Sequence, residues 1–86
     1  MQNDKTPEVN IGLAVRQKMS EQGTTIAWLA RQVACDSGNL HKQLQKFYIY
    51  PELLERISVA LNFDFFVYHS NHVRQIIENK RNKDTM

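Results

Sequence analysis

The chain has 86 residues and a mass of 10.1 kDa, which is enough for one small domain. Apolar residues make up 42% of it and charged residues 23%, a composition typical of folded globular proteins and not of disordered chains. No apolar run reaches the roughly 18 residues of a membrane-spanning helix, and a single cysteine excludes an intrachain disulfide. The polar start, which includes Asp4 and Glu8, is unlike a secretory signal peptide. A reducing cytoplasm is the expected location.

The formal net charge of +2 is unevenly distributed along the sequence. Residues 10–47 carry +3 and residues 70–86 carry +2, whereas residues 1–9 carry −1 and residues 48–69 carry −2. Such an asymmetry is typical of a protein that turns one face toward a polyanion. Solvated lysines on an ordinary surface produce the same pattern, so charge alone leaves both interpretations open.

Apolar residues at helical spacing begin after residues 1–9, which are predicted to form a flexible N-terminal arm. They recur every four residues at Ile11, Val15 and Met19, and Gly23 is a typical stop for that first helix. Thr24 or Thr25 can cap a second helix. That helix is expected to bury Leu29, Ala30 and Val33 and to end near Ala34.

A third helix is predicted from Ser37 to about Gln45, with Asp36 as its N-cap. Leu40 and Leu44 share one face of it at a spacing of four residues. The opposite face carries side chains that are polar or absent, at Gly38, His41, Lys42 and Gln45. A polar face of this kind suits contact with a polar partner.

The second half of the chain predicts further helices around one connection. Residues 46–51 are expected to connect the third helix to a fourth, with the side chains of Phe47 and Ile49 directed inward. Pro51 is expected to begin the fourth helix. Leu54, Ile57 and Leu61 keep the helical spacing, Leu53 and Ala60 flank them, and the helix is expected to stop at Asn62.

A short fifth helix capped by Asp64 is expected to carry Phe65, Phe66 and Tyr68. Beyond Ser70 the apolar pattern weakens, although Val73, Ile76 and Ile77 could line a further helical segment, and residues 79–86 are polar and expected to fray. The prediction is an all-α, compact bundle of about five short helices in residues 10–69, with residues 70–86 as a partly helical tail.

The stretch Thr25-Ile-Ala-Trp-Leu-Ala-Arg-Gln-Val-Ala-Cys-Asp-Ser-Gly-Asn-Leu40 resembles a helix-turn-helix. Its spacing places Leu29 and Val33 as anchors of one helix, with a small Ala30 where the two helices cross. Together with the Leu-rich segment that ends at Phe66, the chain from Ile11 to Tyr68 resembles the lambda-repressor-like domains of small bacterial XRE and Cro regulators. The resemblance implies sequence-specific binding of double-stranded DNA by a small transcriptional regulator, dimeric on its operator, without a cofactor.

The family's docking mode, carried onto this sequence, inserts the helix from Ser37 to about Gln45 into the major groove. The implied base contacts are Ser37, Gly38, Asn39, His41 and Lys42. The implied phosphate contacts are Thr25, Ile26, Arg31, Asp36, Gln45 and Lys46. An ordinary solvated helix face is the alternative for each of these residues. Arg16 and Lys18 are further candidate phosphate partners.

The chain departs from the family pattern at several positions. Ala34 stands where the family has a glycine in a left-handed conformation, which is expected to cost about 1 kcal/mol. Met19 and Leu44 occupy the positions of a common arginine–glutamate pair, which predicts an apolar contact in its place. Trp28 stands where the family often has an acidic residue; it could be an exposed partner anchor or pack against a neighbouring helix.

Other functions have weaker support in the sequence. Cys35 is expected to pack in the core, and the pair His69 and His72 without further ligands does not predict a metal site. No nucleophile with a base and no phosphate-binding glycine loop points to an enzyme. The competing class is a protein-interaction module that uses Trp28, a Phe65/Phe66 patch or residues 73–77. Phe65, Phe66 and Tyr68 are also the expected dimer patch.

Overall fold

The computed structural model describes residues 9–84 of the chain, and within that range it contains five α-helices and no strand. The helices are α1 (Ile11–Gln22), α2 (Ile26–Gln32), α3 (Ser37–Gln43), α4 (Pro51–Leu61) and α5 (Phe66–Asp84). The all-α fold class is therefore confirmed. The predicted N-terminal arm lies outside the described residues except for Val9.

Most helix ends are fixed by capping residues that can be recognised in the sequence. Thr25 caps α2 by accepting the Trp28 N–H at 3.1 Å, and Asp36 caps α3 by accepting the Asn39 N–H at 3.0 Å. Pro51 is the first residue of α4, and Asn62 ends that helix in a left-handed conformation with φ 55°. Gly23 ends α1 at φ 71°, a conformation that glycine adopts without strain.

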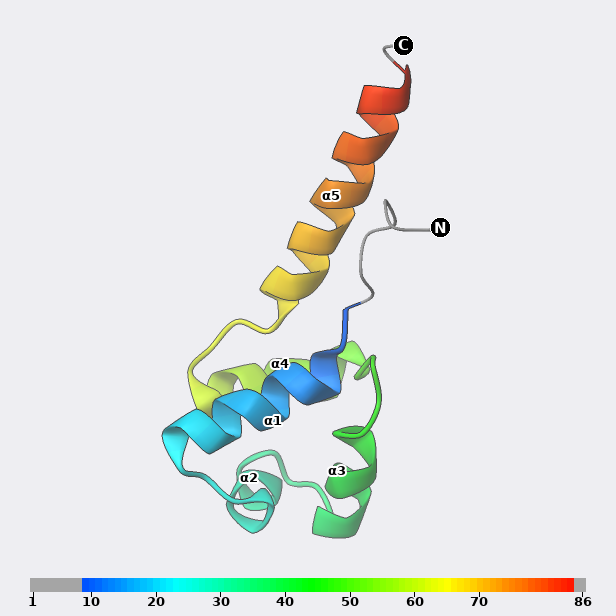
Figure 1. Cartoon of the computed structure of the whole chain (residues 1–86). Coiled ribbons are helices and arrows are strands. Elements are labelled where there is room, and N and C mark those ends of the chain that lie inside the picture. The colour runs from blue at the N-terminus through cyan, green and yellow to red at the C-terminus, as the bar shows by residue number, and fades with distance from the viewer. Residues whose placement is uncertain (1–8, 85–86) are drawn as a thin grey trace.

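The core lies between α1, α2, α3 and α4 (Figure 1). All four contribute side chains to one cluster, to which Ile49 and Phe65 are added from the connections; its buried residues are Ile11, Val15, Met19, Leu29, Ala30, Val33, Leu40, Leu44, Ile49, Leu53, Leu54, Ile57, Leu61 and Phe65. Met19 and Leu44, which were predicted to make an apolar contact, are both buried in this cluster. Trp28 and Cys35 pack against its margin, half-buried, as core packing predicts.

The connection between α3 and α4 corrects one prediction. Ile49 is buried, with 5% of its surface exposed, but Phe47 is 45% exposed and does not enter the core. The backbone carbonyl of Phe47 accepts the N–H of Ile11 at 2.7 Å, so the segment is held by its main chain. That contact orients the peptide and leaves the phenyl ring at the surface.

Helix α5 differs most from the sequence-based expectation. The short helix expected around Phe66 and the segment after Ser70 form one continuous helix of 19 residues. Asp64 caps its start by accepting the Phe66 N–H at 2.9 Å. Figure 1 shows α5 leaving the bundle and pointing away from α2 and α3, which gives the molecule an extent of 52 × 25 × 22 Å. Within residues 9–84 no helix is long and apolar enough to cross a membrane.

Candidate nucleic-acid interface

The pair α2 and α3 is joined by a tight turn that sets the position of α3. Ala34 adopts φ 55°, a left-handed conformation that favours glycine. The Cys35 N–H then bonds to the Ala30 carbonyl at 2.9 Å, which closes the turn on the end of α2. Leu40 is fully buried and anchors α3 to the core. As a result, one face of α3 is fixed inward and the other faces outward.

The exposed surface of α3 contains all five predicted base-contact residues. They are exposed: Ser37, Gly38, Asn39, His41 and Lys42. Gly38 is crowded by one side chain only, since an added Cβ would lie 3.2 Å from the Asp36 carboxylate, a tight contact. Asn39 is partly held in place, because its side-chain amide contacts the Cys35 sulfur at 3.7 Å. The face is polar, and the described residues leave it uncovered.

The predicted phosphate contacts divide into two groups. Thr25, Ile26, Arg31 and Asp36 lie at α2 and at the start of α3, and all except the half-buried Ile26 are exposed. The hydroxyl of Thr25 and the carboxylate of Asp36 serve as helix caps. A carboxylate repels phosphate, so the backbone N–H is the part of Asp36 that suits an anion.

Gln45 and Lys46 form the second group, and the structure corrects their setting. The helix predicted to reach about Gln45 ends at Gln43, with Leu44 as its C-cap. Gln45 and Lys46 therefore belong to a turn, where the Gln45 N–H bonds to the Lys42 carbonyl at 3.2 Å and the Lys46 N–H to the Gln43 carbonyl at 3.1 Å. Both side chains are exposed. The helical part of the interface is shorter than predicted.

Helix α1 holds the end of α3 through three hydrogen bonds that sequence reasoning missed. The Arg16 Nε donates to the Leu44 carbonyl at 3.0 Å, the Gly12 N–H to the Lys46 carbonyl at 3.0 Å, and the Ile11 N–H to the Phe47 carbonyl at 2.7 Å. The two amides belong to the first turn of α1, whose N–H groups have no partner inside the helix. The Lys46 and Phe47 carbonyls, which follow α3, supply these partners. The same bonds hold the segment after α3 against α1.

Gly12 is required for this contact. A Cβ on Gly12 would clash with the carbonyl oxygens of Lys46 and Leu44, both backbone atoms. The glycine in the first turn of a helix was the sequence signal for a close approach. Arg16, a candidate phosphate partner, donates its Nε to the Leu44 carbonyl from a half-buried position.

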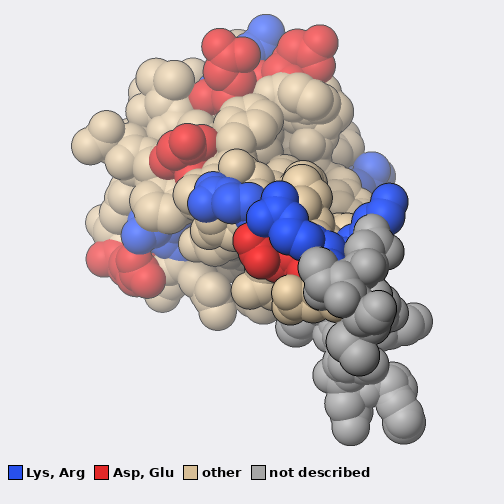
Figure 2. Space-filling model, turned by 90° about the horizontal axis from the view of Figure 1, so that it is seen from above, with Lys and Arg blue, Asp and Glu red and all other residues tan. Residues whose placement is uncertain are grey.

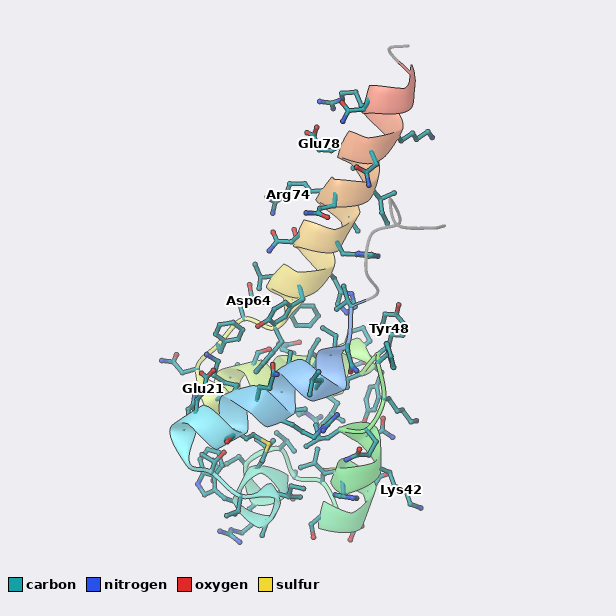
Figure 3. The ribbon with its side chains drawn as sticks, viewed as in Figure 1. Glu21, Lys42, Tyr48, Asp64, Arg74 and Glu78 are labelled. Carbon is teal, nitrogen blue, oxygen red and sulfur yellow. The ribbon has the colours of Figure 1, made fainter. Side chains whose placement is uncertain are left out.

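Two exposed aromatic rings lie in the connection after α3. Tyr48 and Tyr50 are 52% and 51% exposed, and the Tyr48 ring stacks on His69 of α5 with 5.8 Å between ring centroids. Figure 3 shows Lys42 and Tyr48 on the same side. His69 is thus packed against a ring, and no group of three metal-ligating side chains occurs in the described part of the chain.

Comparisons with protein-family models, with curated proteins and with solved structures found no match to this chain.

Proposed function

We propose that this protein binds double-stranded DNA sequence-specifically as a small cytoplasmic transcriptional regulator, with α3 in the major groove. The observation that carries the proposal is the exposed polar face of α3, where five predicted base-contact residues lie on a helix anchored by Leu40. A major groove about 12 Å wide accepts one helix. The left-handed Ala34 supports the resemblance to a helix-turn-helix, because the turn takes the conformation that the family requires.

The distribution of charge supports the same function. Lys42 and Lys46 lie exposed at the end of α3, and Arg31 lies exposed on α2. Few basic residues gather there, so non-specific binding is expected to be weak and to fall moderately with salt. A dimer would place two α3 helices at half-sites about 34 Å apart.

The test compares two lysines with different assigned roles. Duplexes selected from a random library give the preferred site, and fluorescence anisotropy then measures affinity for that site and for an unrelated duplex. Lys42→Ala is expected to lose about 1–3 kcal/mol of preference for the selected site, because the residue is assigned to a base edge. Lys46→Ala is the matched control: it is expected to weaken both duplexes equally, because a phosphate contact carries no sequence information. Equal binding of all duplexes by all three proteins overturns the proposal.

A protein-interaction module is the second candidate, and one observation favours it. The exposed apolar side chains on α5 form a surface that DNA binding by α3 does not use; they are Val73, Ile76 and Ile77. Phe65, one of the residues predicted for such a surface, is fully buried and cannot contact a partner, and Trp28 packs half-buried against the core. Failure of the library selection together with capture of a protein through α5 would favour this candidate.

A further inference from the structure

The segment between α3 and α4 presents aromatic rings at the surface of the protein. Phe47, Tyr48 and Tyr50 are 45%, 52% and 51% exposed, and we call these three residues the aromatic connection. Large aromatic side chains contribute most when a core or an interface buries them. Ile49, between the two tyrosines, is buried. Because side chains of an extended segment alternate between its two faces, both tyrosines lie on the outward face.

The aromatic connection is held in place by its backbone and by one ring contact. The Phe47 carbonyl is bonded to the first turn of α1 at 2.7 Å, and the Tyr50 carbonyl accepts the Leu54 N–H at 3.0 Å. The Tyr48 ring stacks on His69 of α5 with 19° between the ring planes. Groups that are already fixed lose little conformational entropy when a ligand binds, so these rings suit stacking with a planar partner.

The charge next to the aromatic connection is basic. No acidic residue occurs between Asp36 and Glu52, whereas Lys42 and Lys46 are both exposed in that stretch. Figure 2, seen from the side of α5, differs in this respect, because acidic side chains lie among the basic ones on that face. Exposed rings beside lysines, without a carboxylate among them, are typical of surfaces that bind nucleic acid through bases and phosphates.

Unpaired bases fit this surface better than a duplex does. In a duplex each base is stacked between its neighbours, so a ring at the protein surface meets the sugar–phosphate backbone. An unpaired base exposes both of its faces, and an aromatic side chain can stack on either one. Recognition of a major groove by α3 relies on polar side chains and leaves these rings without a role. The aromatic connection therefore suits a single strand.

We propose that the aromatic connection binds single-stranded DNA, with unpaired bases stacked on Phe47 and Tyr50 and with the phosphates attracted by Lys46. Stacking is tolerant of sequence, so this binding differs from the base reading proposed for α3. The choice of DNA over RNA rests on the proposed function, because the aromatic connection begins four residues after the end of α3 at Gln43. The single-strand site is otherwise independent of duplex recognition.

Fluorescence anisotropy of the full chain with a labelled oligothymidylate of about 12 nucleotides tests the proposal. Phe47→Leu keeps an apolar side chain and removes the ring. It is expected to raise the dissociation constant at least about fivefold, because one base loses its stacking surface. Tyr50→Leu is expected to have an effect of similar size for the same reason.

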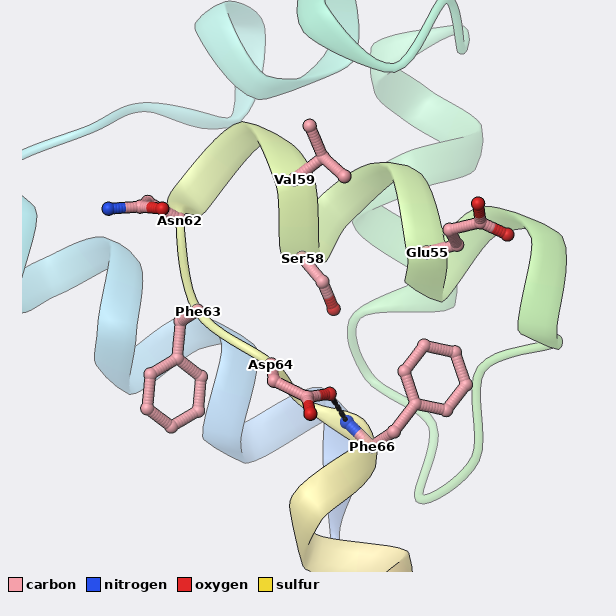
Figure 4. A pocket seen from close by; sticks show the side chains of 7 residues that line it. All are labelled: Glu55, Ser58, Val59, Asn62, Phe63, Asp64 and Phe66. Carbon is pink, nitrogen blue, oxygen red and sulfur yellow. Dashed lines mark hydrogen bonds between the residues drawn. The ribbon is translucent and has the colours of Figure 1, made fainter.

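Phe66→Leu is the matched control. The Phe66 ring is also exposed, at 37%, but it lines a pocket together with the carboxylates of Glu55 and Asp64, as Figure 4 shows. Carboxylates repel the phosphates of a strand, so the dissociation constant is expected to stay within about twofold of that of the wild type. An equal loss in Phe47→Leu and Phe66→Leu contradicts the assignment of the bases to the aromatic connection.

Photo-crosslinking locates the bases directly. An oligothymidylate with one 5-iodouracil is irradiated on the protein, and mass spectrometry identifies the side chain to which it becomes attached. A crosslink to Phe47 or Tyr50 is expected, because the halogenated base reacts with a ring on which it stacks. Crosslinks confined to aromatic residues outside the aromatic connection overturn the proposed site.

The remaining outcomes separate this proposal from the function proposed for α3. A wild type that does not bind oligothymidylate, or that binds it equally well after Phe47→Leu and Tyr50→Leu, overturns the single-strand site alone. Binding of oligouridylate at least about tenfold more tightly overturns the choice of DNA. Phe47→Leu is expected to leave affinity for the library-selected duplex within about twofold of wild type. Loss of duplex preference with intact single-strand binding contradicts the function of α3 only.

Discussion

The two ends of the molecule are constructed in opposite ways. At one end α3 exposes a polar face, while its apolar face is buried and its C-terminus is bonded to α1. At the other end α5 exposes an apolar stripe, and beyond Ser70 few described contacts fix it to the domain (Figure 1). A rigidly held polar face suits recognition of a rigid polar partner, whereas an unsupported apolar face calls for a partner that completes its packing.

The sharpest test of this contrast compares one buried and one exposed leucine-sized residue. Leu40→Ala on α3 removes a fully buried side chain and is expected to lower the free energy of unfolding by about 2–5 kcal/mol. Ile77→Ala on α5, where the side chain is 47% exposed, is expected to change it by less than about 0.5 kcal/mol in the monomer. Urea denaturation at low protein concentration measures both. Equal losses would show that α5 is packed as firmly as α3.

A second test concerns the close contact between α1 and the segment that follows α3. Gly12→Ala forces a Cβ against two backbone carbonyls, so we expect a loss of about 2–3 kcal/mol in the free energy of unfolding. Gly38→Ala is the control: its Cβ would meet only the Asp36 side chain, at 3.2 Å, and no backbone atom, so the expected change is no more than about 1 kcal/mol in either direction. Thermal denaturation compares the two. Tolerance of Gly12→Ala would mean that the segment after α3 can move away from α1.

The smallest effect concerns the turn between α2 and α3. Ala34→Gly removes the strain of a left-handed alanine and is expected to stabilise the protein by about 1 kcal/mol. Asn62→Gly, at the other left-handed non-glycine position of the described residues, is expected to raise the free energy of unfolding by only a few tenths of a kcal/mol, since asparagine tolerates that conformation. The midpoints of urea denaturation of the two variants measure this difference. A destabilising Ala34→Gly would contradict the strain assigned to this turn.

The sequence by itself determined the features that depend on near neighbours. The caps at Thr25 and Asp36, the stop at Asn62 and the start at Pro51 each involve groups within about one helical turn, so local chemistry decides them. The exposed face of α3 followed for the same reason: with Leu40 buried, helical spacing places Lys42 outward.

The tertiary structure decided what depends on contacts between distant segments. Phe47 stays outside and Ile49 enters the core because the Phe47 carbonyl is bonded to the Ile11 N–H of α1, more than thirty residues earlier in the sequence. The close approach at Gly12 and the bond from Arg16 to Leu44 have the same non-local origin. The continuation of α5 through Ser70 was also not predicted from the sequence. Apolar periodicity reveals a helix by its buried face, and most side chains of α5 are exposed.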